Sequence, residues 1–261
     1  WEQINANLPE NGCTYTIGVD HVDPNLLFVG TTYGVYMSNT REVHWVKLTN
    51  GLPASVLVMD LDIQPEENDL VVSTFGRGVY ILDNYAPLRQ LTSEQLEQEA
   101  ILFPIEDGLM FVQADPLGFP GVGFQGASYY TAPNPEVGAV IRYYLKEAPK
   151  SLKDQRLEAE KNLQKEGKDV HYPDYATLKK EALQEDPFLL IAISDLEGQV
   201  IRKIKQPLQA GLQQVIWDFR TSPVGPASLT PFDNSVPWNS PELGYMVAPG
   251  QYLVSLYRYA D

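Results

Sequence analysis

The chain has 261 residues, of which 44% are hydrophobic and 20% are charged, and it contains 19 Gly and 20 Pro. This apolar content is that of a globular protein with a packed core, and the aromatic, glycine and proline residues favour short strands joined by tight turns. The net charge of −15 repels phosphate backbones and anionic membrane surfaces, and no basic patch reverses it, so we expect no nucleic acid as a partner.

Residue counts also exclude sites that need two or more cysteines and argue against a transmembrane helix. Cys13 is the single cysteine, so the chain can form no intrachain disulfide and no cysteine-based metal site. No stretch approaches the roughly 20 apolar residues of a transmembrane helix, and we therefore expect no membrane span.

The first part of the chain contains an internal repeat with a period of 44 residues. The pairs that align without a gap are Trp1 with Trp45, Leu8-Pro9 with Leu52-Pro53, Leu26 with Leu70, Gly34 with Gly78, and Val35-Tyr36 with Val79-Tyr80. Each unit is typical of a strand, an acidic turn and a hairpin. We predict strands at 15–19, 26–30 and 34–37, and again at 57–63, 70–73 and 78–82.

Four short strands in about 40 to 50 residues are the pattern of one β-propeller blade, a sheet that buries both faces only when neighbours stack on it. The alternative is a chance similarity between two β-meanders. Two blades cannot close a ring. We therefore expect the remaining blades in another chain or in an N-terminal part that has been removed, with the true N-terminus upstream of Trp1.

The segment from Ser38 to Trp45 resembles a degenerate Asp-box, the Ser-x-Asp-x-Gly-x-x-Trp turn of sialidases and sortilin-like proteins. Ser38 and Trp45 match, whereas Thr40 replaces Asp and Glu42 replaces Gly. The second unit ends in residues 74–84, which look like the closing blade of bacterial sortilin-like, BNR-repeat proteins often labelled as glycosyl hydrolases. This resemblance implies a secreted, periplasmic or outer-surface location. It names no catalyst, because Asp-boxes are structural.

The propeller part is predicted to end at residue 84, so that the terminal blades occupy residues 1–84. Thr92 and Gln95 then offer a capping box for a short helix that reaches about Glu99. The sequence that follows is rich in Gly, Pro and aromatic residues and shows little periodicity. We interpret residues 85–135 as a helix and connector between two domains.

The second half is predicted to form an antiparallel sandwich over residues 136–261. Its strands are expected at 139–145, 188–194, 199–205, 213–218 and 251–257. Gly198, Gly211, Trp217 and Tyr252 belong to a pattern that resembles the immunoglobulin-like domain of flagellar hook-capping proteins. That resemblance names an architecture and no reaction.

Residues 151–186 interrupt this sandwich with two charged helical segments, separated by Gly167 and Pro173. A helical insertion must place its apolar stripe somewhere. We expect it to cover an edge strand, and docking to a partner is the alternative.

The polar residues indicate no complete catalytic site. His21, His44 and His171 lack the spacing of metal ligands, and no metal or cofactor is predicted. A glycosidase needs two carboxylates about 5 to 10 Å apart. The candidates that lie on or beside inner strands, either facing a central channel or serving as turn caps or surface residues, are Asp20, Asp60 and Asp62. Asp23 and Asp69 leave calcium binding at the acidic turns open.

Tyr33, Arg77 and the Asn50-Gly51 turn are the candidate ligand-binding residues, because blade connections of this kind open on one face of a propeller. Arg77 can offer its guanidinium to a carboxylate, or it can form an intramolecular ion pair. We expect a non-catalytic fragment of a secreted propeller protein that binds carbohydrate or peptide and assembles domains. The alternatives are part of a glycoside hydrolase whose acids lie mostly in missing blades, and a peptide-binding or protease-like assembly.

Overall fold

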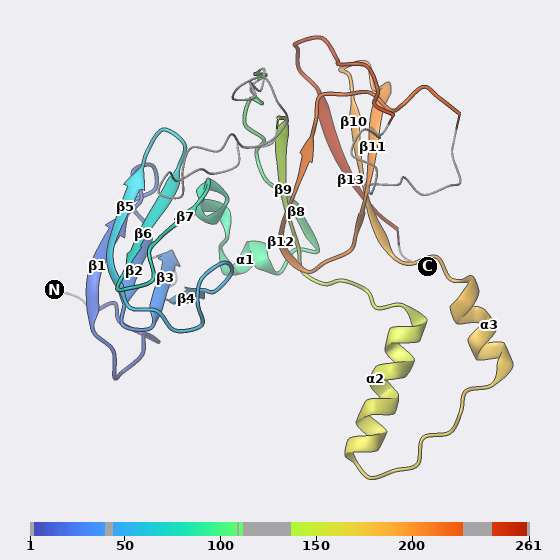
Figure 1. Ribbon diagram of the computed structural model, residues 1–261, viewed down its shortest axis with the longest axis horizontal. Coiled ribbons are helices and arrows are strands. Elements are labelled where there is room, and N and C mark those ends of the chain that lie inside the picture. Colours follow the sequence, from blue (N-terminus) through green and yellow to red (C-terminus); the bar gives the residue numbers. More distant parts are fainter. Residues whose placement is uncertain (1–2, 40–43, 109, 112–136, 227–241, 260–261) are drawn as a thin grey trace, which may run out of the picture. The chain divides into compact units, whose positions relative to one another are not determined.

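The computed structural model describes residues 3–39, 44–108, 110–111, 137–226 and 242–259 (Figure 1). The chain is mainly β, and its strands form small antiparallel sheets. It divides into two compact units, Trp1–Glu99 and Ala100–Asp261. The centre of the Asp-box-like segment, residues 40–43, lies outside the described residues, as does the part of the expected connector from residue 112 onward.

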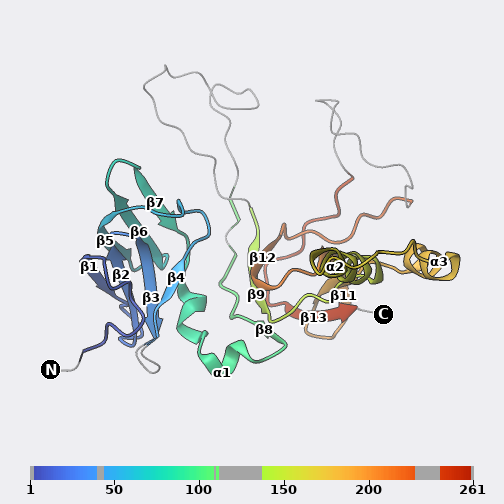
Figure 2. The same ribbon diagram turned by 90° about the horizontal axis from the view of Figure 1, so that it is seen from below.

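The first unit contains two antiparallel sheets whose strands follow one another in chain order (Figures 1 and 2). The four-stranded sheet is built from β1 (Thr14–Val19), β2 (Leu26–Thr31), β3 (Gly34–Asn39) and β4 (Val46–Leu48). The three-stranded sheet is built from β5 (Val58–Gln64), β6 (Asp69–Thr74) and β7 (Val79–Leu82). The strands predicted from the repeat are confirmed, and their ends differ from the prediction by no more than about two residues.

The two sheets repeat each other in detail. The pairing of the first two strands shifts register between Thr14 and Thr16 in one sheet and between Val58 and Asp60 in the other, at the same positions of the sequence repeat. The Thr16 hydroxyl donates a hydrogen bond to the Asp60 carboxylate over 3.2 Å, and these residues are also equivalent in the repeat. The sequence repeat is therefore a structural repeat, with a β-bulge in the first strand of each unit.

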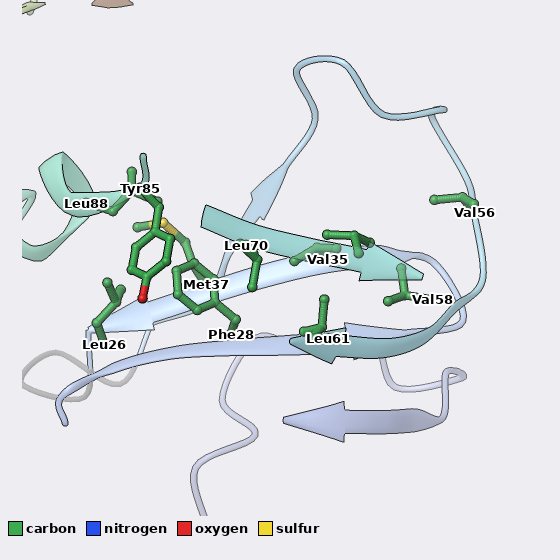
Figure 3. Packing of buried hydrophobic residues seen from close by; sticks show 11 residues of the cluster. Leu26, Phe28, Val35, Met37, Val56, Val58, Leu61, Leu70, Tyr85 and Leu88 are labelled. Carbon is green, nitrogen blue, oxygen red and sulfur yellow. The ribbon is translucent and has the colours of Figure 1, made fainter. Parts of the chain in front are cut away.

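The larger hydrophobic core cluster of the first unit lies between these sheets (Figure 3). Alternate side chains of β2 and β3 meet those of β5 and β6, as expected where a strand places every second residue on one face. The fully buried members include Leu26, Phe28, Val35, Val58 and Leu70. A Cβ atom at Gly30 would come within 2.7 Å of both Thr16 and Val58, so glycine is required at this contact between the sheets.

The first unit extends beyond the expected boundary at residue 84. The 3₁₀-helix η1 (Ala86–Gln90) and the single turn α1 (Ser93–Leu96) belong to it, because Tyr85 and Leu88 are buried in the same core. The predicted capping box is confirmed: the Thr92 hydroxyl accepts from the Gln95 N–H, and the Gln95 side chain accepts from the Thr92 N–H. The helix ends at Leu96, before the expected Glu99.

The second unit contains two three-stranded antiparallel sheets that share one core. One has the order β11 (Val200–Pro207), β10 (Phe188–Ser194), β13 (Leu253–Tyr259), and the other has the order β12 (Gly211–Trp217), β9 (Ala139–Leu145), β8 (Ala100–Leu102). Buried side chains from both sheets, among them Ile141, Ile191 and Trp217, pack together. The five predicted strands are confirmed. The additional strand β8 comes from the expected connector.

Two helices, α2 (Leu152–Lys165) and α3 (Tyr175–Leu183), follow β9 as the predicted insertion. The expectation that they cover an edge strand is wrong, because neither helix has a buried residue. They are joined to each other instead. The Arg156 guanidinium donates to Glu160 over 2.6 Å and to Glu181 over 2.6 Å, so charged side chains form the contact.

Replacing Phe28 by alanine should lower the free energy of unfolding of the first unit by about 3–5 kcal/mol, because it leaves a cavity between the two sheets. Phe28 is fully buried and packs edge-on against Tyr85, with ring centroids 5.0 Å apart. Hydrogen exchange of the β2 backbone amides, recorded over a range of urea concentrations, measures this change in the free energy of unfolding. Phe75→Ala is the matched control, since Phe75 is 72% exposed and should give a change within about 0.5 kcal/mol.

Candidate functional site

The three predicted ligand-binding residues lie at one end of the two sheets of the first unit. Tyr33 is in the β2–β3 turn, Arg77 is in the β6–β7 turn, and Asn50 is in the β4–β5 connection. The pairings beside these turns are Val35 with Leu48 and Val58 with Thr74. Because Gly30, next to the first turn, packs on Val58, these ends of the two sheets adjoin.

Tyr33 is held by its own sheet. Its hydroxyl donates to the Asn11 carbonyl over 3.3 Å, and its ring lies against Gly12, where an added Cβ atom would be 3.0 Å from the ring. The Tyr33 N–H donates to the Thr31 hydroxyl over 3.1 Å. This side chain therefore forms one wall of the turn.

Arg77 is exposed between two glycines in the left-handed region, Gly76 with φ 71° and Gly78 with φ 83°. Within the described part of the chain, its guanidinium forms no ion pair, so the intramolecular alternative is not seen there. Asn50 is exposed next to Gly51, whose φ is 75°. No hydrogen bond between described residues joins any two of Tyr33, Asn50 and Arg77, so they adjoin without forming one constellation.

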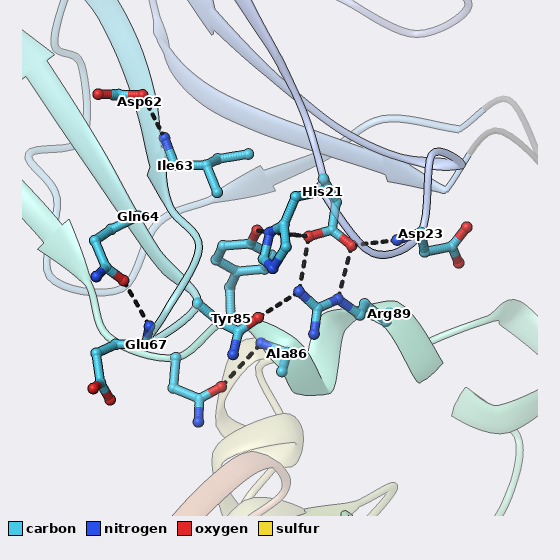
Figure 4. Close-up of polar contacts among 12 residues, drawn as sticks. His21, Asp23, Asp62, Ile63, Gln64, Glu67, Tyr85, Ala86 and Arg89 are labelled. Atoms are coloured by element: carbon cyan, nitrogen blue, oxygen red, sulfur yellow. Dashed lines mark hydrogen bonds and ion pairs between the residues drawn. The ribbon is translucent and has the colours of Figure 1, made fainter.

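A densely bonded polar cluster of the first unit surrounds Asp20, directly after β1, and Figure 4 shows its members Tyr85 and Arg89. Its carboxylate is 3% exposed and accepts from the Arg89 Nε over 2.7 Å and the Arg89 Nη2 over 2.8 Å. It also accepts from the Tyr85 hydroxyl over 2.6 Å and the Asp23 N–H over 2.7 Å. Four donors thus saturate one buried carboxylate.

Two neighbours complete the cluster. The Arg89 Nη2 also donates to the Asn68 side-chain oxygen over 2.6 Å, and Asn68 lies in the β5–β6 turn with φ 59°. His21 Nδ1 is 3.3 Å from the Tyr85 hydroxyl and 3.5 Å from the Asp20 carboxylate. The cluster therefore ties the acidic turn of each sheet to η1.

The electrostatics of this cluster oppose catalysis. Burial raises the pKa of Asp20, but the hydrogen bonds from Arg89, Tyr85 and Asp23 together outweigh it and hold the pKa far below the ordinary value. Burial and the hydrogen bond to Asp20 raise the pKa of the Tyr85 hydroxyl. A general acid or base must exchange a proton near neutral pH. Asp20 stays ionised and fully bonded, so it stabilises the fold.

The other candidate carboxylates do not join Asp20. Asp60 and Asp62 are exposed on β5, and each accepts a hydrogen bond from the backbone N–H of the following residue. A glycosidase acid of raised pKa needs an apolar or like-charged environment. Neither side chain has an apolar enclosure, and the interpretation of Asp20 as a channel-facing acid is wrong because that side chain is a buried turn cap.

The carboxylate of Asp23 bonds its own turn, whereas that of Asp69 bonds the segment that follows β7. Asp23 accepts from the N–H and the side-chain amide of Asn25, and Asp69 accepts from the Asn84 N–H over 2.8 Å. Among the residues that the structure describes, no three side chains of the His, Cys, Asp or Glu type gather to hold a metal ion. The Asp23 turn is an Asx-type turn, in which the carboxylate replaces a backbone acceptor.

Comparison with known proteins identifies no relative in which the equivalents of these residues could be examined. No protein-family model, no curated protein and no solved structure matches the chain significantly. Among its described residues, no helix has the length and apolar character that crossing a membrane demands.

Sequence reasoning named Asp20 but missed Arg89 and Tyr85, its two side-chain partners. The partners are 69 and 65 positions away, and no local spacing connects them. The available signal was weak: Tyr85 and Arg89 belong to the same short segment, four positions apart.

Replacing Asp20 by asparagine should lower the free energy of unfolding by about 3 kcal/mol at pH 7, because it leaves the partly buried Arg89 cation without its counter-charge. The wild-type contribution has a defined pH dependence. Since the folded-state pKa of Asp20 lies below the ordinary 3.8, the contribution is complete above about pH 4 and is lost as the pH falls through the folded-state pKa.

Urea unfolding of both proteins between about pH 7 and pH 2 measures this dependence. The stability difference should be constant down to about pH 4 and narrow below it. Asp62→Asn, which removes an exposed carboxylate from the same unit, should change stability by no more than about 0.5 kcal/mol. A stability difference between the wild type and Asp20→Asn that grows as the pH falls would contradict the assignment of Asp20 as the ionised partner of Arg89.

Proposed function

We propose that the chain is a non-catalytic binding and assembly part of an Asp-box propeller protein of the bacterial sortilin-like kind. In this proposal the first unit supplies terminal propeller blades, and the second unit is an immunoglobulin-like domain with a helical insertion. The protein acts outside the cytoplasm, as the resemblance of residues 38–45 and 74–84 implies. Its ligand is a carbohydrate or a peptide that carries a carboxylate.

The exposed guanidinium of Arg77 is the observation that carries the binding role. It stands at a turn between two glycines, where no neighbouring Cβ atom obstructs an approaching group. An arginine fork binds a carboxylate through two parallel hydrogen bonds. The exposed Asn50 side chain, which belongs to the same end of the sheets, supplies both an amide donor and a carbonyl acceptor.

The repeat supports the propeller arrangement. Two consecutive units of 44 residues form consecutive antiparallel sheets, and these sheets pack face to face with equivalent residues Thr16 and Asp60 in contact. Stacked sheets of this size and topology are how propeller blades bury their faces. The same arrangement brings the connections between strands to one end, where the candidate residues lie.

The described carboxylates favour binding over glycoside hydrolysis. Asp20 is locked in an ion pair with Arg89, and Asp60 and Asp62 are exposed and bonded to their own strand. A glycosidase requires one protonated and one ionised acid on opposite sides of a sugar. The described residues provide no such pair.

Arg77→Ala should weaken binding of the correct ligand at least tenfold, because a hydrogen-bonded charge pair is worth about 1.5–3 kcal/mol. Two probes separate the ligand classes: an oligosaccharide of uronic acid units, and a peptide with a free C-terminal carboxylate. Titration calorimetry at low salt measures the affinity for each probe, because salt screens an exposed ion pair between Arg77 and the ligand carboxylate.

Arg77→Lys should retain part of the affinity, because it keeps the charge and loses the fork. Lys168→Ala removes an exposed cation from the helical insertion and should leave binding unchanged. Equal affinity of the wild type and Arg77→Ala for whichever probe binds would contradict the assignment of Arg77. Release of reducing sugar from the oligosaccharide would instead favour the glycoside hydrolase.

A further inference from the structure

The strand β13 is an edge of its sheet and has a regular backbone. The sheet order is β11, β10, β13, so within the described part of the chain only one side of β13 is paired. All residues of Leu253–Tyr259 pair with β10 without a register shift. Residues 253–257 form no backbone hydrogen bond with any other described segment. The N–H and C=O groups of alternate residues in this stretch therefore point away from β10 and are free to pair with a further strand.

The other edge strands of the second unit are less suited to pairing. β11 contains Pro207 and the exposed Lys203 and Lys205, and its ladder with β10 has a register shift, which are features that oppose addition of a strand. β8 is only three residues long. In β12, Val215 and Trp217 are 8% and 3% exposed, so the core side of that strand is already closed.

The core side of β13 is less well covered than that of its neighbour. The core-facing residues of β10, Leu189, Ile191 and Ile193, are at most 1% exposed. Val254 and Leu256 of β13 pack against the same core but are only partly buried. A strand flanks β10 on each side, whereas β13 is flanked on one, so a further strand beside β13 would cover both residues. The edge is therefore open in its side chains as well as in its backbone.

The sequence of β13 is self-complementary in the antiparallel direction. Two copies of the strand, aligned so that Ser255 lies opposite Ser255, place Leu253 opposite Tyr257 and Val254 opposite Leu256. The first pair lies on the outer face, where its side chains are 49% and 56% exposed, and the second pair lies on the core side. The single charged residue of the strand falls opposite an uncharged one. This register therefore joins apolar side chains on both faces and opposes no charges.

We infer that a second copy of this chain binds at β13, with the two β13 strands antiparallel and Ser255 on the two-fold axis. The two three-stranded sheets then form one continuous sheet across the contact. Both copies use the same surface, so the assembly closes as a dimer. The self-complementary register favours a second copy over an unrelated strand. The inference concerns the second unit alone and goes beyond the proposed binding function, on which it does not depend.

Charges at Ser255 test both the partner and the register. Ser255→Lys or Ser255→Glu places like charges directly opposite each other on the axis, so each variant alone should have a dimerisation constant at least about tenfold below that of the wild type. An equimolar mixture of the two variants should recover the association of the wild type, because opposite charges then face each other. Sedimentation velocity of the full chain over a range of concentrations measures the association of each sample.

Leu212→Lys is the matched control, since it adds the same charge to the other long edge strand, β12, at a residue that is 45% exposed, and it should dimerise like the wild type. Circular dichroism and urea unfolding verify that each substituted chain remains folded. The inference is overturned by a wild type that stays monomeric, by single Ser255 variants that dimerise like the wild type, or by a mixture that associates no better than its components.

Discussion

A sheet of three or four short strands cannot cover its own faces, and this constraint governs the first unit. Its hairpins satisfy backbone hydrogen bonds within each sheet, but the apolar side chains that β2, β3, β5 and β6 turn toward the other sheet leave water only when the sheets stack. Stacking in turn demands close approach, which the missing side chain at Gly30 permits. The second repeat unit forms the second sheet, and the core forms where the two sheets pack together.

The ion pair between the buried Asp20 and the partly buried Arg89 determines the direction of the chain after the second sheet. Apolar packing of Tyr85 and Leu88 holds η1 against the core, but packing alone is non-directional. The bidentate contact, together with the bond from Arg89 to Asn68, sets the orientation of this segment against both acidic turns. Its net energy is modest, because desolvation opposes the Coulomb attraction, whereas loss of one partner is costly.

The sequence predicted the elements better than their tertiary contacts. Strand positions could be predicted because alternating apolar residues and the 44-residue repeat are visible in the sequence itself. The Thr92–Gln95 capping box is likewise a pattern of neighbouring residues. The first-unit boundary was placed too early, since the burial of Tyr85 depends on residues far away in the chain. The docking of the insertion was also predicted incorrectly, because the apolar residues of α2 and α3 did not reveal that Arg156 would join the helices through charge.

For the candidate site, sequence reasoning found Tyr33, Asn50 and Arg77 through the topology of a blade, and the structure brings their turns to one end of the sheets. It did not find the Asp20 cluster, because long-range side-chain pairs leave no periodic trace. Which residues remain free for a ligand is a tertiary property. Tyr33 is engaged by Asn11 and Gly12, and a single sequence cannot show this.

The helical insertion has an energetic consequence of its own. Helices α2 and α3 contain no buried residue, and the pair is joined mainly by charged groups. Its opening therefore exposes little new apolar area and has a low free energy compared with unfolding of the sheets. Backbone amides of this insertion should exchange with solvent by local opening, independently of β9 and β10, which makes it a separate cooperative element within the second unit.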